Sequence, residues 1–308
     1  MRRQERKYKN TIIAIIVLVV AVCALWLVML AVYGEERDTA AASEASGGAS
    51  GGEPNGADTE GQAEAPAGPG DAEGVAEANE GPEMPPFYDE SRSERYADFA
   101  ALRPELAFDD VVWMVNVNLD LTPYDDAVET ANPESLTVLV NKFFYLPDGF
   151  TPPDLTPIGQ SMLRGEAATA MHEMISDASE EGYTLWVQSG YRSFSVQSGL
   201  YSQYSARDGA EAADTYSARP GHSEHQLGLA ADLNTITDAF GFTGEGIWTA
   251  ENCWKYGFIV RYTEENTGIT LYKPEPWHVR YIGRDAAGAM RDRGIQSFEE
   301  YWARHIAS

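Results

Sequence analysis

The chain has 308 residues, with 48 acidic and 22 basic side chains and a formal net charge of −26 at pH 7. This acidity argues against nucleic acid as a partner, because binding to phosphates needs clustered lysine and arginine side chains. Two cysteines exclude a disulfide framework and a zinc site built from thiolates, while 44% hydrophobic residues suffice for a real core.

The N-terminal residues predict a membrane anchor. Residues 1–10 form a basic tail, and residues 11–33 are apolar and carry no charge. A run of about 20 apolar residues crosses the ~30 Å hydrocarbon layer of a bilayer. Because basic flanks stay in the cytoplasm, we expect an uncleaved single-pass anchor in the cell membrane with the rest of the chain outside. A cleaved signal peptide is the alternative, but its apolar stretch would have only about 7–15 residues.

Residues 34–90 predict a disordered acidic linker. Up to about Pro86 they consist mainly of Gly, Ala, Glu, Asp, Ser and Pro, and Arg37 is their only base. Such a stretch cannot bury enough apolar surface to offset the entropy lost on ordering. We interpret it as a tether extended by like-charge repulsion.

Residues 91–308 predict one globular domain. Leu163, Ala167, Met171, Met174 and Ala178 lie at helical spacing, and Gly182 follows as a stop signal. Another helix is expected at 194–204, and strands are expected at 136–147, 184–189, 227–233 and 278–283. Short strands mixed with helices, without regular βαβ alternation, are typical of an α+β fold.

Asp232 stands out because it interrupts an apolar strand. Leu229, Ala231 and Leu233 share one face of that strand, and Asp232 shares the other with small residues. A buried carboxylate must be matched by a cation, a base or a metal. His225 can fold over the same face, so either a hydrogen-bonded His–Asp pair or a shared metal would satisfy Asp232.

A second polar segment is KPEPWHVRYIG, residues 273–283. Residues three apart in a flat strand point to opposite faces. For Glu275 and His278 to serve one site, Glu275 must therefore lie in the turn before the strand, which Pro274 and Pro276 favour. The alternative is a surface glutamate beside a packed Trp277.

Together, His225, Asp232 and His278 supply three ligands and leave a fourth tetrahedral position for water, the layout of catalytic zinc. Glu275 would then be a general base outside the ligand shell. Of the five histidines, His222 competes with His225 but reads as a loop residue, as the following strand favours His225. His172 is expected to face solvent and His305 to lie in a frayed tail, whereas Cys253 is expected to be a buried apolar side chain.

Arg192 follows a strand and a glycine, in a turn before a helix. A guanidinium in such a loop suits a developing oxyanion or a substrate carboxylate. Pairing with a surface acid is the alternative for an arginine in this acidic domain.

These segments resemble a known family. SEHQLGLAAD (residues 223–232) is similar to the S-x-H-x-x-G-x-A-x-D signature of VanY-type D-alanyl-D-alanine carboxypeptidases, EPWH (275–278) to their E-P-W-H, and SGYRS (189–193) to their S-G-Y-R-S. The three motifs occur in the order and spacing of the family, and the resemblance runs from about residue 138 to residue 283.

The resemblance implies a zinc peptidase with the compact α+β fold shared by D,D-peptidases and the hedgehog signalling domain. It implies His225, Asp232 and His278 as the ligands of Zn2+, Glu275 as the catalytic base, and Arg192 as the group that stabilises the transition state. Ser223 and Gln197 would help to hold the end of the peptide. None of these positions departs from the pattern of the family.

The expected function is removal of the terminal D-alanine from peptidoglycan stem peptides. An L,D-carboxypeptidase and a D,D-dipeptidase remain alternatives, which the segment 208–218 would decide between. A non-catalytic zinc domain that binds wall peptides is a further alternative, although such a domain would have no need of Glu275.

Overall fold

A computed structural model of the chain describes residues 84–307. The predicted basic tail, the membrane anchor at 11–33 and the linker as far as residue 83 lie outside the described residues. Within residues 84–307, no helix combines the length and the apolar character needed to cross a membrane.

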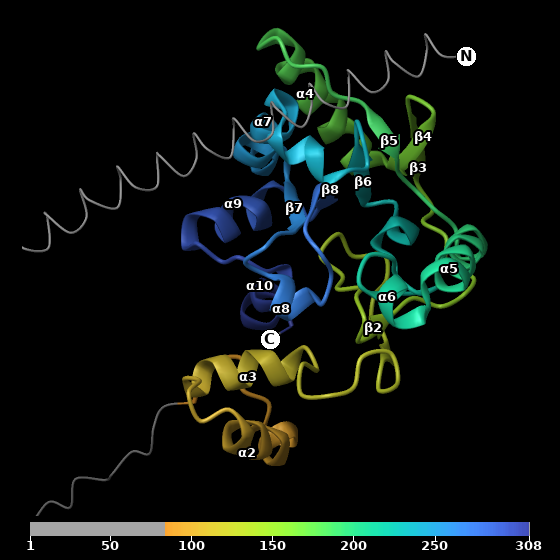
Figure 1. The fold of residues 1–308 in the computed structure, drawn as a ribbon. Helices are drawn as coiled ribbons and strands as arrows, with labels where there is room; N and C mark the ends of the chain where they lie inside the picture. Colours follow the sequence, from red (N-terminus) through yellow and green to blue (C-terminus); the bar gives the residue numbers. More distant parts are fainter. Residues whose placement is uncertain (1–83, 308) are drawn as a thin grey trace, which may run out of the picture. The chain divides into compact units, whose positions relative to one another are not determined.

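The centre of the domain is a four-stranded antiparallel sheet with the strand order β5-β6-β8-β7 (Figure 1). Its strands are β5 (Val187–Ser189), β6 (Ala230–Leu233), β7 (Phe258–Tyr262) and β8 (Glu275–Tyr281). The two middle strands, β6 and β8, therefore lie side by side although about 40 residues separate them in the sequence. This pairing places Asp232 directly opposite His278.

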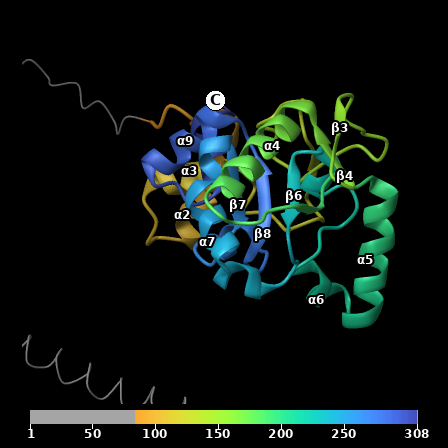
Figure 2. The ribbon, with the colours of Figure 1, turned by 90° about the horizontal axis from the view of Figure 1, so that it is seen from above.

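Helices and short sheets surround this centre, which confirms the predicted α+β class. Figures 1 and 2 both place α5 beyond the β5 side of the sheet and α9 beyond the β7 side. The α-helices are α2 (Ser93–Leu102), α3 (Phe108–Asn116), α4 (Gly165–Glu180), α5 (Phe194–Asp208), α6 (Ala210–Asp214), α7 (Gly244–Asn252), α8 (Thr267–Thr270), α9 (Arg284–Arg293) and α10 (Phe298–His305). The remaining elements are β1 (Val128–Glu129) paired with β2 (Phe144–Tyr145), β3 (Leu155–Ile158) paired with β4 (Ser161–Arg164), and the 3-10 turns η1 (Glu90–Arg92), η2 (Glu224–Leu227), η3 (Asp238–Phe242) and η4 (Cys253–Tyr256).

Helix α4 forms where the apolar spacing predicts it. Its buried face consists of alanine and methionine side chains, including Met171 and Met174, which pack against the core under the sheet. The helix ends at Glu180, and Gly182 follows with a φ of +89°, a conformation that favours glycine. Through this face the helix joins the same apolar core as Val187 of β5, Leu233 of β6 and Val279 of β8.

The strand predicted at 136–147 is mostly wrong, since only β2 (Phe144–Tyr145) forms there. Val138, Leu139 and Val140 are buried, but Val138 and Val140 face one core cluster and Leu139 faces another. The Arg280 guanidinium donates to the carbonyls of Leu136 and Val138 in place of a neighbouring strand. The segment is thus buried on both sides without a sheet partner.

Helices α2 and α3 form a pair at the N-terminal end of the described chain. Tyr96 and Val112 are buried in its small apolar cluster, which Phe87 and Tyr88 also join. The pair is linked to α10 by the ion pair between Asp110 and Arg304, whose N···O distance is 2.8 Å. Packing in this domain therefore already involves residues before the predicted start at 91.

Candidate metal centre

The side chains of His225, Asp232 and His278 converge. One ligand atom from each lies within 4.8 Å of the other two, and each residue is only 4% exposed. They come from η2, β6 and β8, and the glycine between the first two elements, Gly228, has a φ of +67°. This residue turns the chain from η2 into β6, so the strand predicted at 227–233 begins only at Ala230. Leu229, Ala231 and Leu233 enter the core as predicted, which leaves Asp232 free to face the site.

His225 is oriented by the main chain of a distant segment. Its Nδ1 lies 2.7 Å from the carbonyl oxygen of Gly190, and its Nε2 lies 3.4 Å from Asp232 Oδ2. A carbonyl can only accept a hydrogen bond, so Nδ1 carries the proton and the Nε2 lone pair points into the cluster. A metal-binding histidine is typically fixed by such an outer partner.

The charges in the cluster favour a cation. Burial alone would raise the pKa of Asp232, but His225 and His278 lower it below its usual range, so Asp232 is ionised. Burial lowers the pKa of His225, and Arg192 adds to this effect, so that imidazole is neutral. Burial opposes the charge of His278 as well, yet Asp232 and Glu224 raise its pKa to about 9. Without a metal ion, the protonated His278 ring supplies the positive charge beside Asp232, and its Nδ1 lies 3.3 Å from Asp232 Oδ1.

Two imidazole nitrogens and one carboxylate are the ligands of a catalytic zinc site, which keeps one position open. A cavity of about 130 Å³ opens onto all three side chains, so a substrate can reach them. The residues therefore fit Zn2+ rather than the metal-free His–Asp pair, because His278 adds a third ligand to the same point. The convergence on which the predicted metal site depends is confirmed in the described chain.

Glu275 lies at this cavity, but not in the way the sequence indicates. It is the first residue of β8 rather than part of a preceding turn. Tyr262 pairs with Glu275 and Val260 with Val279, so two steps along β7 match four along β8, and a bulge absorbs the difference. Glu275 Oε2 therefore lies 3.5 Å from His278 Nδ1. Burial raises the pKa of Glu275 to about 7, a value suited to a general base at neutral pH.

Arg192 lies in the loop between β5 and α5, as predicted, and it also faces the cavity. Its guanidinium donates to Ser189 Oγ at 3.0 Å and to Gln197 Oε1 at 2.8 Å. Arg192 also reaches Asp232 Oδ2 at 3.5 Å. Its acidic partner is therefore the buried aspartate of the site and not a surface acid. Gln197 is buried and donates to the Ala218 carbonyl at 2.7 Å, while Ser223 lines the cavity.

The remaining histidines and Cys253 stand outside the cluster. His222 Nδ1 lies 2.7 Å from the Asn141 carbonyl oxygen, and the ring packs against Tyr124 and Tyr145. His172 is exposed as predicted, whereas the frayed tail predicted for His305 is wrong, because this residue ends α10. Cys253 is buried as predicted, and burial raises the pKa of its thiol to about 12.

Sequence reasoning missed a set of buried charges beneath the site. Glu224, Arg261 and Arg280 are at most 2% exposed, and Glu224 Oε2 lies 3.4 Å from His278 Nε2. A signal was present, since Arg261 and Arg280 interrupt apolar strands just as Asp232 does. At the level of sequence, the rule that a buried charge needs a partner was applied only to Asp232. Applied to Arg261 and Arg280 as well, the same rule would have predicted buried acidic partners for them.

Comparison with known proteins gives a consistent family. The model of the VanY family, described as D-alanyl-D-alanine carboxypeptidase, matches residues 160–284. YodJ of Bacillus subtilis (strain 168), which is named as a carboxypeptidase, is 39% identical over 196 residues, covering 58% of this chain and 71% of YodJ. A D-alanyl-D-alanine carboxypeptidase of Enterococcus faecium is 39% identical over 137 residues, covering 44% of this chain and 42% of that protein, so the chain matches about two fifths of its length.

Among solved structures, the LdcB LD-carboxypeptidase, whose structure is described as revealing the molecular basis of peptidoglycan recognition, has a TM-score of 0.55 and 37% sequence identity. This match covers 59% of the chain and 92% of LdcB. Residues 160–284, which match the family model, include the three candidate ligands, Glu275 and Arg192. The chain therefore belongs to the VanY family of D-alanyl-D-alanine carboxypeptidases, and its catalytic centre is that of a zinc peptidase.

Proposed function

We propose that this protein removes the terminal D-alanine from peptidoglycan stem peptides on the outer side of the cell membrane. The observation that carries the proposal is the position of Glu275, whose carboxylate lies 3.5 Å from the His278 ligand at the cavity. A domain that only bound wall peptides would gain nothing from a partly buried acid with a pKa of about 7 at this point. Membership of the VanY family supports the same reaction.

The residues of the chain divide the work of hydrolysis between them. Zinc held by His225, Asp232 and His278 would supply a Lewis acid that polarises the scissile carbonyl and makes water more acidic. Glu275 lies where it can take a proton from the attacking water and return it to the amine nitrogen when the C–N bond breaks. Arg192 donates one hydrogen bond to Gln197 and one to Ser189, from two different nitrogens. A guanidinium has five N–H donors, so others remain for the developing oxyanion.

The cavity is suited to a small terminal residue. Its volume is about 130 Å³, and its wall includes Gln197, Ser223, Tyr204 and Tyr216. Gln197 is held in place by Arg192 and by the Ala218 carbonyl, so its amide is fixed relative to the base and the ligands. We assign Gln197 and Ser223 to the binding of the end of the peptide.

The test uses the purified full chain, loaded with zinc, and a synthetic stem pentapeptide ending in D-Ala-D-Ala. Mass spectrometry should detect loss of one D-alanine, and a chelator should abolish this loss until zinc is restored. Release that continues after complete zinc removal, or no release from the zinc-loaded protein, would contradict the proposal.

An L,D-carboxypeptidase is the second candidate, favoured by the similarity to LdcB. The bond cut by such an enzyme follows an L-residue, so its substrate is a stem tetrapeptide with a single terminal D-alanine. Tyr216, Ser217 and Ala218, which belong to the predicted specificity segment 208–218, line the cavity. Parallel reactions with penta- and tetrapeptide separate the two activities, since each predicts a preferred substrate.

The location outside the membrane is supported by the sequence. The charge-free run 11–33 behind a basic tail is long enough for a spanning helix, and the acidic linker after it gives the catalytic domain reach. Protease added to intact cells should release the domain only if it faces outward. If the full chain stays intact in protease-treated cells but is digested once the cells are lysed, the domain lies inside the cell and the proposed location is wrong.

A further inference from the structure

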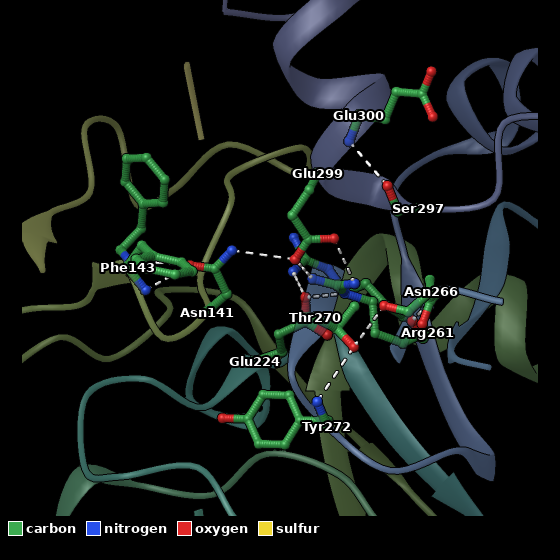
Figure 3. A network of polar contacts seen from close by, with 12 residues as sticks. Asn141, Phe143, Glu224, Arg261, Asn266, Thr270, Tyr272, Ser297, Glu299 and Glu300 are labelled. Atoms are coloured by element: carbon green, nitrogen blue, oxygen red, sulfur yellow. Dashed lines mark hydrogen bonds and ion pairs between the residues drawn. The ribbon is translucent and has the colours of Figure 1, made fainter. Parts of the chain in front are cut away.

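Beneath the zinc ligands lies a cluster of four buried charges, here named the buried quartet: Glu224, Arg261, Arg280 and Glu299. None of the four is more than 2% exposed. The two acids and two bases balance, so the quartet carries no net charge. Figure 3 shows Arg261 beside both Glu224 and Glu299, with Asn141 reaching Glu299 from another side. Such an arrangement costs desolvation energy, and burial of ion pairs by itself is weak support for stability.

The two oxygens of Glu224 have different partners. Oε1 accepts hydrogen bonds from Arg261 Nε at 2.8 Å and from an Arg280 NH group at 3.0 Å. Oε2 has no hydrogen-bond partner among the described residues, although it is completely buried. The arginines thus fix the carboxylate through one oxygen and leave the other one aimed elsewhere.

The atom in front of the free oxygen is the outer nitrogen of a zinc ligand. His278 Nε2 lies 3.4 Å from Glu224 Oε2, and within residues 84–307 it too is buried without a hydrogen-bond partner. Its other nitrogen, Nδ1, faces Asp232 and Glu275 in the cluster. Two buried polar atoms, one of which can donate and the other accept, therefore have only each other.

We propose that Glu224 is a positioning residue, which accepts the Nε2–H of His278 and thereby holds its Nδ1 lone pair toward the zinc. The proposal rests on the zinc site of the proposed peptidase. It gives the two histidine ligands opposite tautomers, because His225 is held through Nδ1 by the Gly190 carbonyl. A carboxylate behind a metal-bound imidazole also raises the basicity of the ligand.

The support for Glu224 extends beyond the segment that matches the family model. Arg261, which holds Glu224, is itself held by Glu299 through two hydrogen bonds of 3.0 and 2.6 Å. Glu299 lies in α10, and Asn141 donates to it at 3.1 Å, so both residues lie outside 160–284. The C-terminal helix of this chain thus reaches the metal centre through three charged side chains.

The experiment compares two substitutions, each of which neutralises one of the two glutamates that contact Arg261. In the zinc-loaded full chain, Glu224→Gln should weaken zinc binding by about 10- to 100-fold, measured by competition with a chromogenic chelator. Glu299→Gln, the matched control, leaves the neighbour of His278 in place and should change zinc affinity by less than about threefold. Equal zinc affinity in the wild type and Glu224→Gln would overturn the proposal. Zinc binding is read without substrate, so a protein that passes this test but releases no D-alanine contradicts only the proposed reaction.

A second measurement does not depend on the folding of any variant. In wild-type protein labelled with 15N-histidine and loaded with zinc, NMR should show His278 protonated at Nε2 and His225 protonated at Nδ1. A merely structural quartet would leave the tautomer of His278 undetermined. The proposal fails if His278 carries its proton on Nδ1 or if zinc is coordinated through Nε2.

Discussion

Glu275 and His278 lie on the same strand, three residues apart, yet their side chains meet, with 3.5 Å between Glu275 Oε2 and His278 Nδ1. A regular strand would place them on opposite faces. The pairing of β7 with β8 is irregular between Val260 and Tyr262, because two steps along β7 match four steps along β8, and this bulge changes the direction of Glu275. The proposed catalytic base and a proposed metal ligand are therefore brought together by an irregularity in the sheet.

Replacement of Glu275 by Gln should remove most of the turnover. The amide cannot accept the proton of the attacking water, and general-base catalysis contributes about 10²–10⁴-fold. Zinc affinity should stay near that of the wild type, because Glu275 is not among the three ligands. Steady-state release of D-alanine and chelator competition measure the two quantities. Glu264→Gln, the same change at an exposed position, is the control, and full turnover by Glu275→Gln would show that the base is misassigned.

Replacement of Arg192 by Lys should lower kcat more than it raises KM. Lysine keeps the charge, but its donors sit on a single nitrogen. It therefore lacks the planar fork by which Arg192 reaches Gln197 and Ser189 from two separate nitrogens while facing a third oxygen. Loss of one oxyanion donor typically costs about 10²–10³-fold in kcat. Arg103→Lys, at an exposed arginine far from the cavity, should leave both constants unchanged. A change confined to KM would instead assign Arg192 to substrate binding in the ground state.

Replacement of Gly190 by Ala should weaken zinc binding. A Cβ at this position would lie 2.4 Å from the Met162 carbonyl oxygen and 2.6 Å from Ser161 Oγ, so the backbone must move. The carbonyl that holds His225 Nδ1 moves with it, and loss of such an outer partner costs about 10–100-fold in metal affinity.

Gly199→Ala is the matched control, because nothing lies within 4 Å of the added carbon in α5. There, alanine should stabilise the helix by about 0.5–1 kcal/mol. Chelator competition and thermal unfolding of both variants measure the outcomes. Unchanged zinc affinity in Gly190→Ala would mean that the Gly190 carbonyl does not orient His225.

Lys142 should make the stability of the protein depend on pH above neutrality. It is buried and donates to the carbonyls of Asp214 and Leu271, and burial lowers its pKa from 10.5 to about 8. Between these values the unfolded chain holds the extra proton, so the free energy of unfolding rises with pH.

The contribution of Lys142 to this rise is isolated by substitution. Relative to the variant Lys142→Met, the wild type should gain about 1–3 kcal/mol between pH 7.5 and 10.5. Denaturant unfolding at several pH values measures the difference, and Lys255→Met at an exposed position is the control. A constant difference between wild type and Lys142→Met would show that the buried lysine keeps its ordinary pKa.

The sequence by itself determined the chemistry of the site. An aspartate in an apolar strand needs a partner, and the polar motifs supplied two histidines and an acid, in an order and spacing that resemble those of the VanY family. It also determined α4 and the loop of Arg192, because helical spacing, a glycine stop and a strand–turn–helix pattern are local signals.

Only the tertiary structure decided how these pieces meet. Three features depend on segments far apart in the chain: the pairing of β6 with β8, the bulge that turns Glu275 toward His278, and the burial of residues 138–140 without a sheet partner. The same is true of the contact between Glu224 and His278, because Arg261 and Arg280 fix the carboxylate from two different strands. Local sequence patterns show which polar side chains stand within apolar elements. Long-range packing decides which of these side chains become neighbours.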